Sequence, residues 1–353
     1  MKKPELRVAV VIVTFNSGKY LSRCLTCLEN QTVKPNKVVV VDNNSTDGSL
    51  ENIEGRWPWV EFLHQEQNLG FVGANNLAID KLNGFDWVAL LNPDAFPKAS
   101  WLETLLKAAE ECPTFTCFAS RLLLPETDNT YLDGMGDVYH VSGLAWRRNH
   151  GREATGAHGT YEEVFSACAA AALYKRDDFL RVGGFDERYF NYFEDVDLGF
   201  RWRLAGYRCL YVPEAVVEHV GSGISGPCSD FTVYHGHRNL VWTYFKDMPW
   251  PLLWLYLPQH IVLNLVSVVA FAIRGQARVI LRAKWDALKR LPEILKERRA
   301  VQARKRVGSL AVLRFMGRGW FTPYFRRPMG PQKRRRTLEP RQVDHLNSKE
   351  IGS

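Results

Sequence analysis

The sequence predicts an α/β protein with a mostly parallel sheet, followed by a C-terminal region that is helical and strongly basic. Three observations lead to this prediction. Apolar, β-branched runs alternate with segments of helical spacing, polar clusters follow those runs, and a long hydrophobic window precedes a basic end. The 353 residues suffice for one large domain or two modest ones, and the 46% of hydrophobic residues excludes wholesale disorder.

The first third of the chain is predicted to consist of strands that alternate with helices. The expected strands are residues 8–14, 37–41 and 87–91. The expected helices are residues 19–30, 75–82 and 101–111. This alternation favours a mostly parallel sheet covered on both faces. Residues 125–157 are glycine-rich and are expected to form a loop excursion over the sheet, after which strand-like and helical signals resume at 165–174.

Polar clusters lie at or directly after the ends of the predicted strands. Ligands of such sheets bind beyond the carboxyl ends of the strands. We therefore expect a binding site there, made by Thr14, Asn16, Asp42, Asn44, Asn92 and Asp94. Asp42 can accept hydrogen bonds from a nucleobase or ribose; the alternative is a simple turn followed by an N-cap. Because the chain has neither a GxGxxG after the first strand nor a GxxxxGK[ST], hydride transfer and P-loop phosphoryl transfer lack support.

Asp94 and His219 are candidate ligands of a divalent cation. Mg²⁺ and Mn²⁺ prefer oxygen ligands, and a carboxylate fixed in the Asn-Pro-Asp turn suits a cation that bridges two phosphates. His219 would add an imidazole to the same ion. The alternatives are a turn aspartate and a structural histidine.

The sharpest cluster consists of Glu194, Asp195 and Asp197, three carboxylates within four positions and flanked by aromatic residues. Like charges raise one another's pKa, which suits a general base that removes a proton from a hydroxyl. The alternative is a helix N-terminus with acidic residues on its dipole, and the two interpretations are compatible.

The charge of the chain is divided unevenly. Residues 274–353 hold 22 Lys and Arg against 6 Asp and Glu, whereas residues 1–273 hold 24 against 32. The uncharged window 252–273 precedes the basic region. An apolar helix followed by a basic region favours an anionic membrane surface, and no nucleic-acid-binding module is recognisable.

Within this window, His260, Asn264 and Ser267 recur at helical spacing. That stripe predicts a helix lying in the membrane interface or packed on a partner; the alternative is an ordinary buried helix. A spanning helix is disfavoured by these polar residues and by Pro258, which would break or kink a span.

The cysteines and the N-terminal apolar stretch indicate that the main part of the protein is cytosolic. The seven cysteines do not form a disulfide scaffold, and Cys24 and Cys27 fall in a helical run where they read as small buried residues. The apolar stretch 8–13 is too short for a signal peptide and reads better as a strand.

Six motifs occur in order across residues 8–225, and together they resemble a known family. They are Thr14-Phe15-Asn16, Asp42-Asn43-Asn44-Ser45-Thr46-Asp47-Gly48, Asn68-Leu69-Gly70-Phe71-Val72-Gly73-Ala74-Asn75-Asn76, Leu90-Leu91-Asn92-Pro93-Asp94, Gly183-Gly184-Phe185-Asp186-Glu187 and Phe193-Glu194-Asp195-Val196-Asp197-Leu198. The set closely resembles family 2 inverting glycosyltransferases of the GT-A fold, in particular the rhamnosyltransferase-like group.

The resemblance implies a role for each matched residue. Asp42 would hold the base of the nucleotide, Asp195 would be the catalytic base, and Asp94 and His219 would bind Mg²⁺ or Mn²⁺. The first acidic position of the family's DxD motif is Asn92 here, which predicts weak metal binding. The remaining residues expected to contact the nucleotide sugar are Thr14, Asn16, Asn44, Asn68, Gly73, Asn76 and Asn92, with Glu194 and Asp197 in the acidic cluster beside the acceptor.

The resemblance also implies an activity, which is the inverting transfer of a sugar to a hydroxyl of a cell-surface or lipid-linked glycan. The sugar that the resemblance suggests first is rhamnose, from dTDP-rhamnose. We expect the enzyme to be peripheral on the cytoplasmic face of the cell membrane. The expected organisation is a GT-A domain at 1–235, a helical region at 236–330 and a basic tail at 331–353. The alternatives are a sugar-phosphate nucleotidyltransferase and a non-catalytic, membrane-recruited scaffold.

Overall fold

The computed structural model describes residues 6–325, apart from 49, 52, 126–130, 155–158 and 222–227. The basic tail expected at 331–353 lies outside the described residues.

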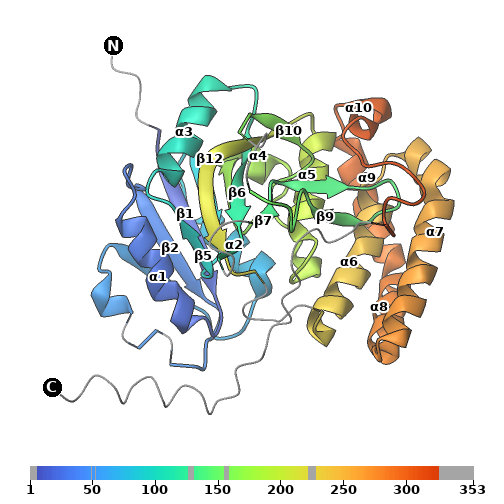
Figure 1. The fold of residues 1–353 in the computed structure, drawn as a ribbon, viewed down its shortest axis with the longest axis horizontal. Helices are drawn as coiled ribbons and strands as arrows, with labels where there is room; N and C mark the ends of the chain where they lie inside the picture. Colours follow the sequence, from blue (N-terminus) through green and yellow to red (C-terminus); the bar gives the residue numbers. More distant parts are fainter. Residues whose placement is uncertain are drawn as a thin grey trace.

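A mixed sheet forms the centre of the described chain (Figure 1). Its strands run in the order β10-β12-β6-β11-β4-β1-β2-β3, with β5 paired to β12 and β7 paired to β6, while β8 and β9 form a separate hairpin. The strands are β1 (Val8–Thr14), β2 (Lys37–Asp42), β3 (Val60–His64), β4 (Trp87–Leu91), β5 (Ala95–Pro97), β6 (Cys117–Leu123), β7 (Leu132–Gly134), β8 (Asp137–Tyr139), β9 (Ala145–Arg147), β10 (Glu162–Val164), β11 (Ala171–Lys175) and β12 (Cys209–His219).

The prediction of a mostly parallel sheet is correct in part, because the sheet is mixed: β6 and β12 are parallel neighbours too, whereas β10 is antiparallel to β12. β4, β1, β2 and β3 are parallel neighbours, but β11 lies between β4 and β6 and is antiparallel to both. Apolar periodicity carries no strand direction, so the sequence could not reveal this reversal. The expected loop excursion contains short strands: β7 pairs with β6, and β8 and β9 form their hairpin.

Helices cover both faces of the sheet. They are α1 (Gly18–Glu29), α2 (Gly70–Asp80), α3 (Trp101–Glu111), α4 (Arg176–Arg181), α5 (Glu194–Leu204), α6 (Asp230–Asp247), α7 (Trp250–Ile273), α8 (Ala277–Lys289), α9 (Leu291–Ala303) and α10 (Ser309–Leu313). Side chains of β1 alternate between two cores: Val8, Val10 and Ile12 pack with α1 and α3, whereas Ala9 and Val11 pack with α2. This alternation explains the continuous apolar run of a strand buried on both faces.

Helix α2 begins at Gly70, five residues before the predicted start at 75. Gly70 has φ +72°, and a Cβ there would lie 2.6 Å from Phe190. Only glycine fits this turn, so Gly70 forms the entry to the helix.

The domain boundary expected at 235/236 falls inside α6. Leu240, Val241 and Trp242 of α6 belong to the same buried core as α2 and β1. Ala287 of α8 and Ile294 of α9 join that core as well. These C-terminal helices are therefore packed onto the sheet domain rather than appended to it.

Helix α7 turns its polar stripe inward and its apolar side chains outward. His260 is buried, its Nδ1 lies 2.8 Å from the carbonyl oxygen of Ser142, and its ring stacks on Tyr244. Pro258 lies inside the helix without ending it, contrary to the expected break. The exposed apolar side chains of the helix are Trp250, Trp254, Leu255, Ile261, Val262, Leu265, Val266, Val269 and Ile273.

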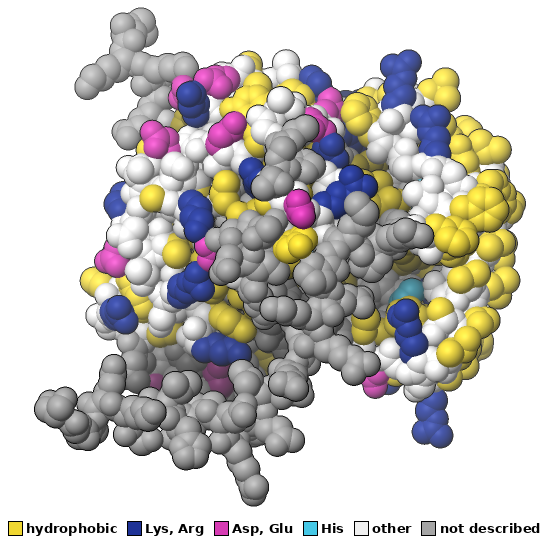
Figure 2. Space-filling view, in the orientation of Figure 1, with side chains coloured by type: hydrophobic (Ala, Val, Ile, Leu, Met, Phe, Trp, Pro, Cys, Tyr) yellow, Lys and Arg dark blue, Asp and Glu magenta, His cyan; other side chains and the backbone are white. Residues whose placement is uncertain are grey.

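Figure 2 shows hydrophobic side chains gathered at the edge of the molecule formed by α7 and α8, with lysines and arginines beside them. The alternative of an ordinary buried helix is therefore wrong. By length and composition, α7 is apolar enough to cross a membrane.

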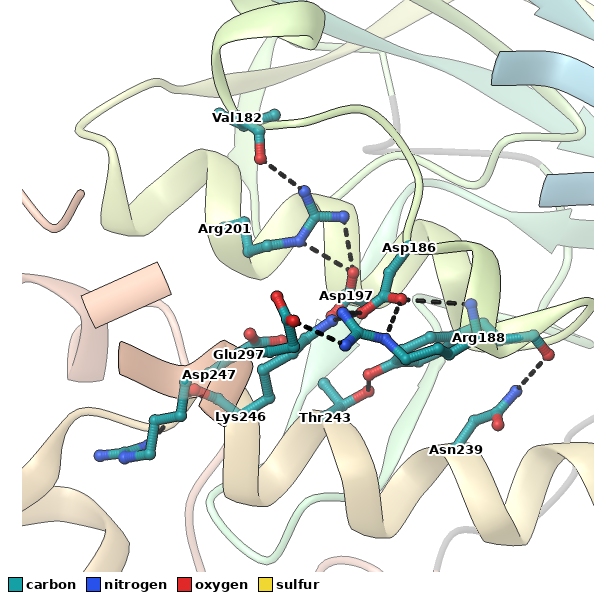
Figure 3. Close-up of polar contacts among 12 residues, drawn as sticks. Val182, Asp186, Arg188, Asp197, Arg201, Asn239, Thr243, Lys246, Asp247 and Glu297 are labelled. Atoms are coloured by element: carbon teal, nitrogen blue, oxygen red, sulfur yellow. Dashed lines mark hydrogen bonds and ion pairs between the residues drawn. The ribbon is translucent and has the colours of Figure 1, made fainter. Parts of the chain in front are cut away.

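A buried ion-pair network joins α6 to the sheet domain (Figure 3). Lys246 of α6 is buried, its Nζ lies 2.5 Å from Asp186 Oδ2, and it also pairs with Asp197 of α5. Arg188 and Arg201 complete the pairing of these two aspartates. Burial alone would raise the pKa of Asp186, but Lys246 and Arg188 hold that pKa well below its usual range.

We expect Lys246→Met to lower the free energy of unfolding by about 3–5 kcal/mol near pH 7, because it removes the buried cation that Asp186 and Asp197 share and leaves each carboxylate with one arginine only. A depressed carboxyl pKa stabilises the fold above the unfolded pKa of about 4, and this stabilisation is lost as the pH falls through the folded pKa. The difference in the free energy of unfolding between Lys246→Met and the wild type should therefore be smaller at acidic pH.

Urea unfolding at pH 7 and at pH 3 measures both effects. Lys289→Met, at an exposed lysine of α8, is the matched control. A deficit equal to that of the control, or equal at both pH values, would contradict the assignment.

Candidate active site

The carboxyl ends of β1, β2 and β3 bring the first group of predicted residues together. Thr14 stands opposite Asp42 in the sheet, and Asp42 stands opposite His64. Asp42 is buried, its Oδ1 accepts a hydrogen bond from the backbone of Ser45 at 3.1 Å, and its Oδ2 lies 3.6 Å from His64 Nδ1. Asp42 therefore sits at the sheet edge where the sequence places it.

The loops beyond these strands are tied to one another by asparagines. Asn16 Oδ1 accepts a hydrogen bond from the backbone of Thr46 at 2.8 Å, which joins the loop after β1 to the loop after β2. Asn16 and Asn44 have φ of 50° and 63°, a left-handed conformation that asparagine tolerates better than most residues. Both residues shape the loops at this edge.

Asn43, which the sequence analysis did not single out, links Asp42 to the start of α2. Its Nδ2 donates to the carbonyl of Gly70 at 2.9 Å, and its Oδ1 accepts from the backbone of Leu69. Asn68 Oδ1 accepts from the backbone of Gly70 at 2.8 Å. Gly73 lies one turn into α2, where a Cβ would come within 3.1 Å of the Leu69 side chain. The Asn68–Gly73 motif is thus placed beside Asp42.

Asn76 of α2 bonds to the backbone of Phe185. Its Nδ2 donates to the carbonyl of Phe185 at 2.8 Å, and its Oδ1 accepts from the backbone N–H of the same residue at 2.9 Å. Both ends of the amide therefore bind the Gly184-Phe185 turn, which ties α2 to the chain that leads to α5. In this structure the amide of Asn76 serves this structural link.

Asp94 and His219 meet as the sequence predicts. Their side chains are buried, and His219 Nε2 lies 3.5 Å from Asp94 Oδ1. The antiparallel pairing of β5 with β12 places His219 opposite Ala95, which explains how residues 125 positions apart in the sequence come together. Asn92 is half-buried at the start of the same turn, and its backbone N–H donates to the carbonyl of Ala170.

Asp133 and Arg147 complete this cluster, and the sequence analysis missed both. His219 Nδ1 donates to Asp133 Oδ2 at 2.7 Å, and Arg147 also pairs with that carboxylate. Burial opposes ionisation of Asp133, but Arg147, His150 and His219 hold its pKa well below the usual range. Burial likewise lowers the pKa of His219, but hydrogen bonds to Asp133 and Asp94 raise it overall. The sequence contains one feature that could have indicated Asp133: two aspartates, Asp133 and Asp137, flank Gly134-Met135-Gly136 in the segment expected to be a loop.

Asp195 lies in the first turn of α5, close to this cluster. Its Oδ2 accepts a hydrogen bond from the backbone of Ala169 at 3.3 Å, and the adjacent carbonyl of Ala170 accepts from Asn92 at 2.8 Å. The residues just before β11 thus connect the Asp195 carboxylate to the turn that carries Asp94. Asp195 is half-buried, and burial raises its pKa, while the charge of Arg147 lowers it in part.

The other two carboxylates of the acidic cluster have different surroundings. Glu194 is buried, and burial together with the charge of Asp195 raises its pKa well above the usual value. Asp197 is fully buried in the network of Figure 3, where Arg201 binds it at 2.6 Å and Lys246 also pairs with it. The ion pairs of Asp197 therefore anchor α5 to α6. Of the three carboxylates, Asp195 fits the part of a base.

The donor set at Asp94 and His219 suits a loosely held divalent cation. Within the described residues, no group of three or more His, Cys, Asp and Glu side chains could hold a metal. Asp133 orients the His219 ring through Nδ1, which leaves Nε2 directed at Asp94, a common arrangement around a metal-binding imidazole. One carboxylate and one imidazole leave the other coordination positions to phosphate oxygens and water, as Mg²⁺ and Mn²⁺ commonly accept.

Comparisons with known proteins identify the family of the chain. The sequence profile of the family described as glycosyl transferase family 2 matches residues 9–183. N-acetylglucosaminyl-diphospho-decaprenol L-rhamnosyltransferase of Mycobacterium tuberculosis is 33% identical over 248 residues, which cover 64% of this chain and 80% of the relative. Pre-mycofactocin glycosyltransferase of Mycobacterium tuberculosis is 33% identical over 218 residues, which cover 60% of this chain and 42% of the relative.

The fold has a counterpart among solved structures. The crystal structure of GalNAc-T7 with UDP, GalNAc and Mn²⁺ is similar, with a TM-score of 0.56, 15% identity, and coverage of 70% of this chain and 49% of that chain. This likeness supports a GT-A-like α/β fold. Since the profile spans strand β2 with Asp42 and the turn with Asp94, and since the chain covers 80% of a relative at 33% identity, the chain belongs to glycosyl transferase family 2.

Proposed function

We propose that this glycosyltransferase moves a sugar, best rhamnose from dTDP-rhamnose, to a hydroxyl of a lipid-linked or cell-surface glycan with inversion at the anomeric carbon. The observation that carries the proposal is the link, through Ala169 and Ala170, between Asp195 and the turn of Asp94, whose carboxylate lies 3.5 Å from His219. The relative named as an L-rhamnosyltransferase acting on N-acetylglucosaminyl-diphospho-decaprenol supports the donor and the acceptor class.

Asp195 is the group that takes the acceptor proton. As the acceptor oxygen bonds to the anomeric carbon, its proton passes to the Asp195 carboxylate and the bond to the nucleoside diphosphate breaks on the opposite face. A base that burial has made more basic than a surface aspartate performs this transfer better. The backbone of Ala169 fixes Oδ2, which leaves the carboxylate oriented before the acceptor arrives.

Asp42 and the loops around it hold the nucleotide. The carboxylate of Asp42 faces the edge where β1, β2 and β3 end, and Asn43 and Asn68 fix the neighbouring turn into α2. Thr14, Asn44, Gly73 and Asn92 line the same end of the sheet in our proposal.

Asp94 and His219 would hold Mg²⁺ or Mn²⁺, with Asp133 orienting the imidazole. Bound there, the cation would neutralise charge on the departing diphosphate. The structural neighbour solved with UDP and Mn²⁺ supports this cofactor.

The exposed face of α7 supports attachment to an anionic membrane surface. Its polar residues face the protein and its apolar residues face outward, which is the arrangement of a helix lying in the membrane interface. Each Lys or Arg held near an anionic leaflet adds about 1 kcal/mol, and basic residues follow α7 directly. Attachment to the cytoplasmic face would bring the active site near a lipid-linked acceptor.

Two rival functions are distinguished by simple assays. A sugar-phosphate nucleotidyltransferase would release pyrophosphate from a nucleoside triphosphate and a sugar phosphate. A non-catalytic scaffold would bind membranes without transferring sugar. The presence of Asp195, Asp94 and His219 in one cluster favours the transferase over both.

We expect Asp195→Asn to lower turnover by about 10²–10⁴-fold, the usual contribution of a general base. Binding of dTDP-rhamnose, measured by calorimetry, should remain close to that of the wild type. Asp177→Asn, at an exposed aspartate of α4, is the matched control and should leave turnover unchanged. Near wild-type turnover of Asp195→Asn would remove Asp195 from this role.

The metal assignment predicts non-additive losses. Asp94→Ala and His219→Ala should each weaken the Mn²⁺-dependent part of nucleotide binding, and the double variant should lose less than the sum because both act on one ion. Calorimetric titration with dTDP in Mn²⁺ and in EDTA measures this. Fully additive losses, or binding indifferent to EDTA, would speak against a shared ion.

The membrane assignment predicts that Leu265→Glu/Val269→Glu reduces flotation with vesicles containing anionic lipid. These side chains are 62% and 58% exposed on α7. Trp59→Glu, at an exposed apolar residue near the start of β3, is the control and should not change flotation. High salt should loosen the wild type from membranes; release only by detergent, after carbonate and salt washes, would mean that α7 spans or inserts deeply.

A further inference from the structure

The turn that leads into α5 has an unusual backbone. Phe190, Tyr192 and Phe193 have φ of 65°, 66° and 69°, although none of them is glycine. Bulky residues rarely adopt this conformation, which costs of order 1–3 kcal/mol per residue and persists only where the surroundings impose it. Asp195, the proposed base, lies two residues after this turn. The contacts that hold the turn in this conformation therefore also affect the position of Asp195.

A single side chain of α6 binds most of the turn. Asn239 is fully buried, and its Nδ2 lies 3.1 Å from the carbonyl oxygen of Tyr189, 3.0 Å from that of Asn191 and 2.7 Å from that of Tyr192. Arg238 fixes its orientation, because Arg238 Nε donates to Asn239 Oδ1 at 2.9 Å. Figure 3 shows Asn239 on α6 directed at the chain beyond Arg188.

The neighbouring arginine reinforces the same contact. Arg238 Nη2 donates to the carbonyls of Arg188 and Tyr189, at 3.2 Å and 3.0 Å. Two consecutive residues of α6 thus contact four of the five carbonyls from Arg188 to Tyr192, all except that of Phe190. Carbonyls that point away from regular structure are costly to bury without partners, so these donors compensate for the strained path of the chain.

The turn determines where α5 begins, and the first turn of α5 determines the position of the Asp195 carboxylate. Phe193 is the N-cap of α5, and its carbonyl accepts the helical hydrogen bond from Asp197 at 2.9 Å. Asp195 Oδ2 meets Ala169 from this first turn. A rotation of the turn would therefore move Asp195 away from Ala169 and from the segment that leads to Asp94.

We infer that Asn239 is a positioning residue of the transfer reaction, which acts by clamping the 189–193 turn so that Asp195 points into the active site. The inference rests on the proposed function because it takes Asp195 as the base. It also gives the C-terminal half of the chain a part in catalysis, since α6 is packed between the sheet domain and the outer helices α8 and α9.

The test compares Asn239→Leu, which keeps the size of the side chain and removes the donor, with Thr243→Val. Thr243 lies one turn further along α6 and contacts the hydroxyl of Tyr189 at 2.8 Å rather than the backbone of the turn. Asn239→Ser serves as a milder variant should the leucine variant not fold. With dTDP-rhamnose and N-acetylglucosaminyl-diphospho-polyprenol, kcat should fall at least tenfold in Asn239→Leu and less in Asn239→Ser. KM for the donor should stay within twofold, and Thr243→Val should match the wild type.

Two further measurements on the full chain do not depend on activity. Hydrogen exchange of residues 189–197 should quicken in the Asn239 variants and not in Thr243→Val. Carbodiimide labels protonated carboxyls, so the pH dependence of labelling at Asp195, followed by mass spectrometry, reports the environment of that carboxylate. The ionisable groups that interact electrostatically with it are Asp137, Arg147, Cys168, Tyr174 and Glu194. Since burial raises the pKa of Asp195, releasing the turn should shift labelling to lower pH.

The outcomes separate the two claims. Absence of transfer by the wild type would defeat the proposed function, and exchange and labelling would then decide the clamp. Faster exchange at 189–197 with unchanged labelling and kcat would mean that Asn239 is structural only and would overturn the inference. Unchanged exchange in both Asn239 variants would overturn the clamp itself.

Discussion

The arrangement of this protein depends on the pairing of buried charge between its two halves. Asp186 and Asp197 lie in the part of the chain that carries the proposed base, and Lys246, which neutralises both, lies in α6. A carboxylate buried without a partner is strongly destabilising. The N-terminal sheet and the C-terminal helices therefore form one unit, and α5, which begins with Glu194 and Asp195, is fixed where they meet.

This unit gives α7 its unusual orientation. His260 bonds to Ser142 and stacks on Tyr244, so the polar side of the helix packs against the protein. The apolar side of the helix is therefore exposed at the surface. An exposed apolar face of this extent indicates an interaction surface. In our proposal that surface is the membrane, and the helix that carries it packs against the same α6 that binds the turn before Asp195.

Much of the site could be predicted because it depends on short-range signals. The strands ending at Thr14, Asp42 and Leu91 were readable from apolar runs, and polar residues after parallel strands converge by geometry alone. The parts that could not be predicted depend on contacts between distant segments. Asp133 contacts His219, which is 86 positions away in the sequence, and the amide of Asn76 binds the distant Phe185. The antiparallel insertion of β11 leaves no trace in the apolar periodicity.

The central claim is that one carboxylate, Asp195, activates the acceptor while the nucleoside diphosphate leaves from the opposite face. The most direct measurement is the anomeric configuration of the product made from dTDP-rhamnose, read from the one-bond C1–H1 coupling by NMR. The account predicts a configuration opposite to that of the donor. Retention of the donor's configuration would require a second displacement, and a single base at Asp195 would not explain it.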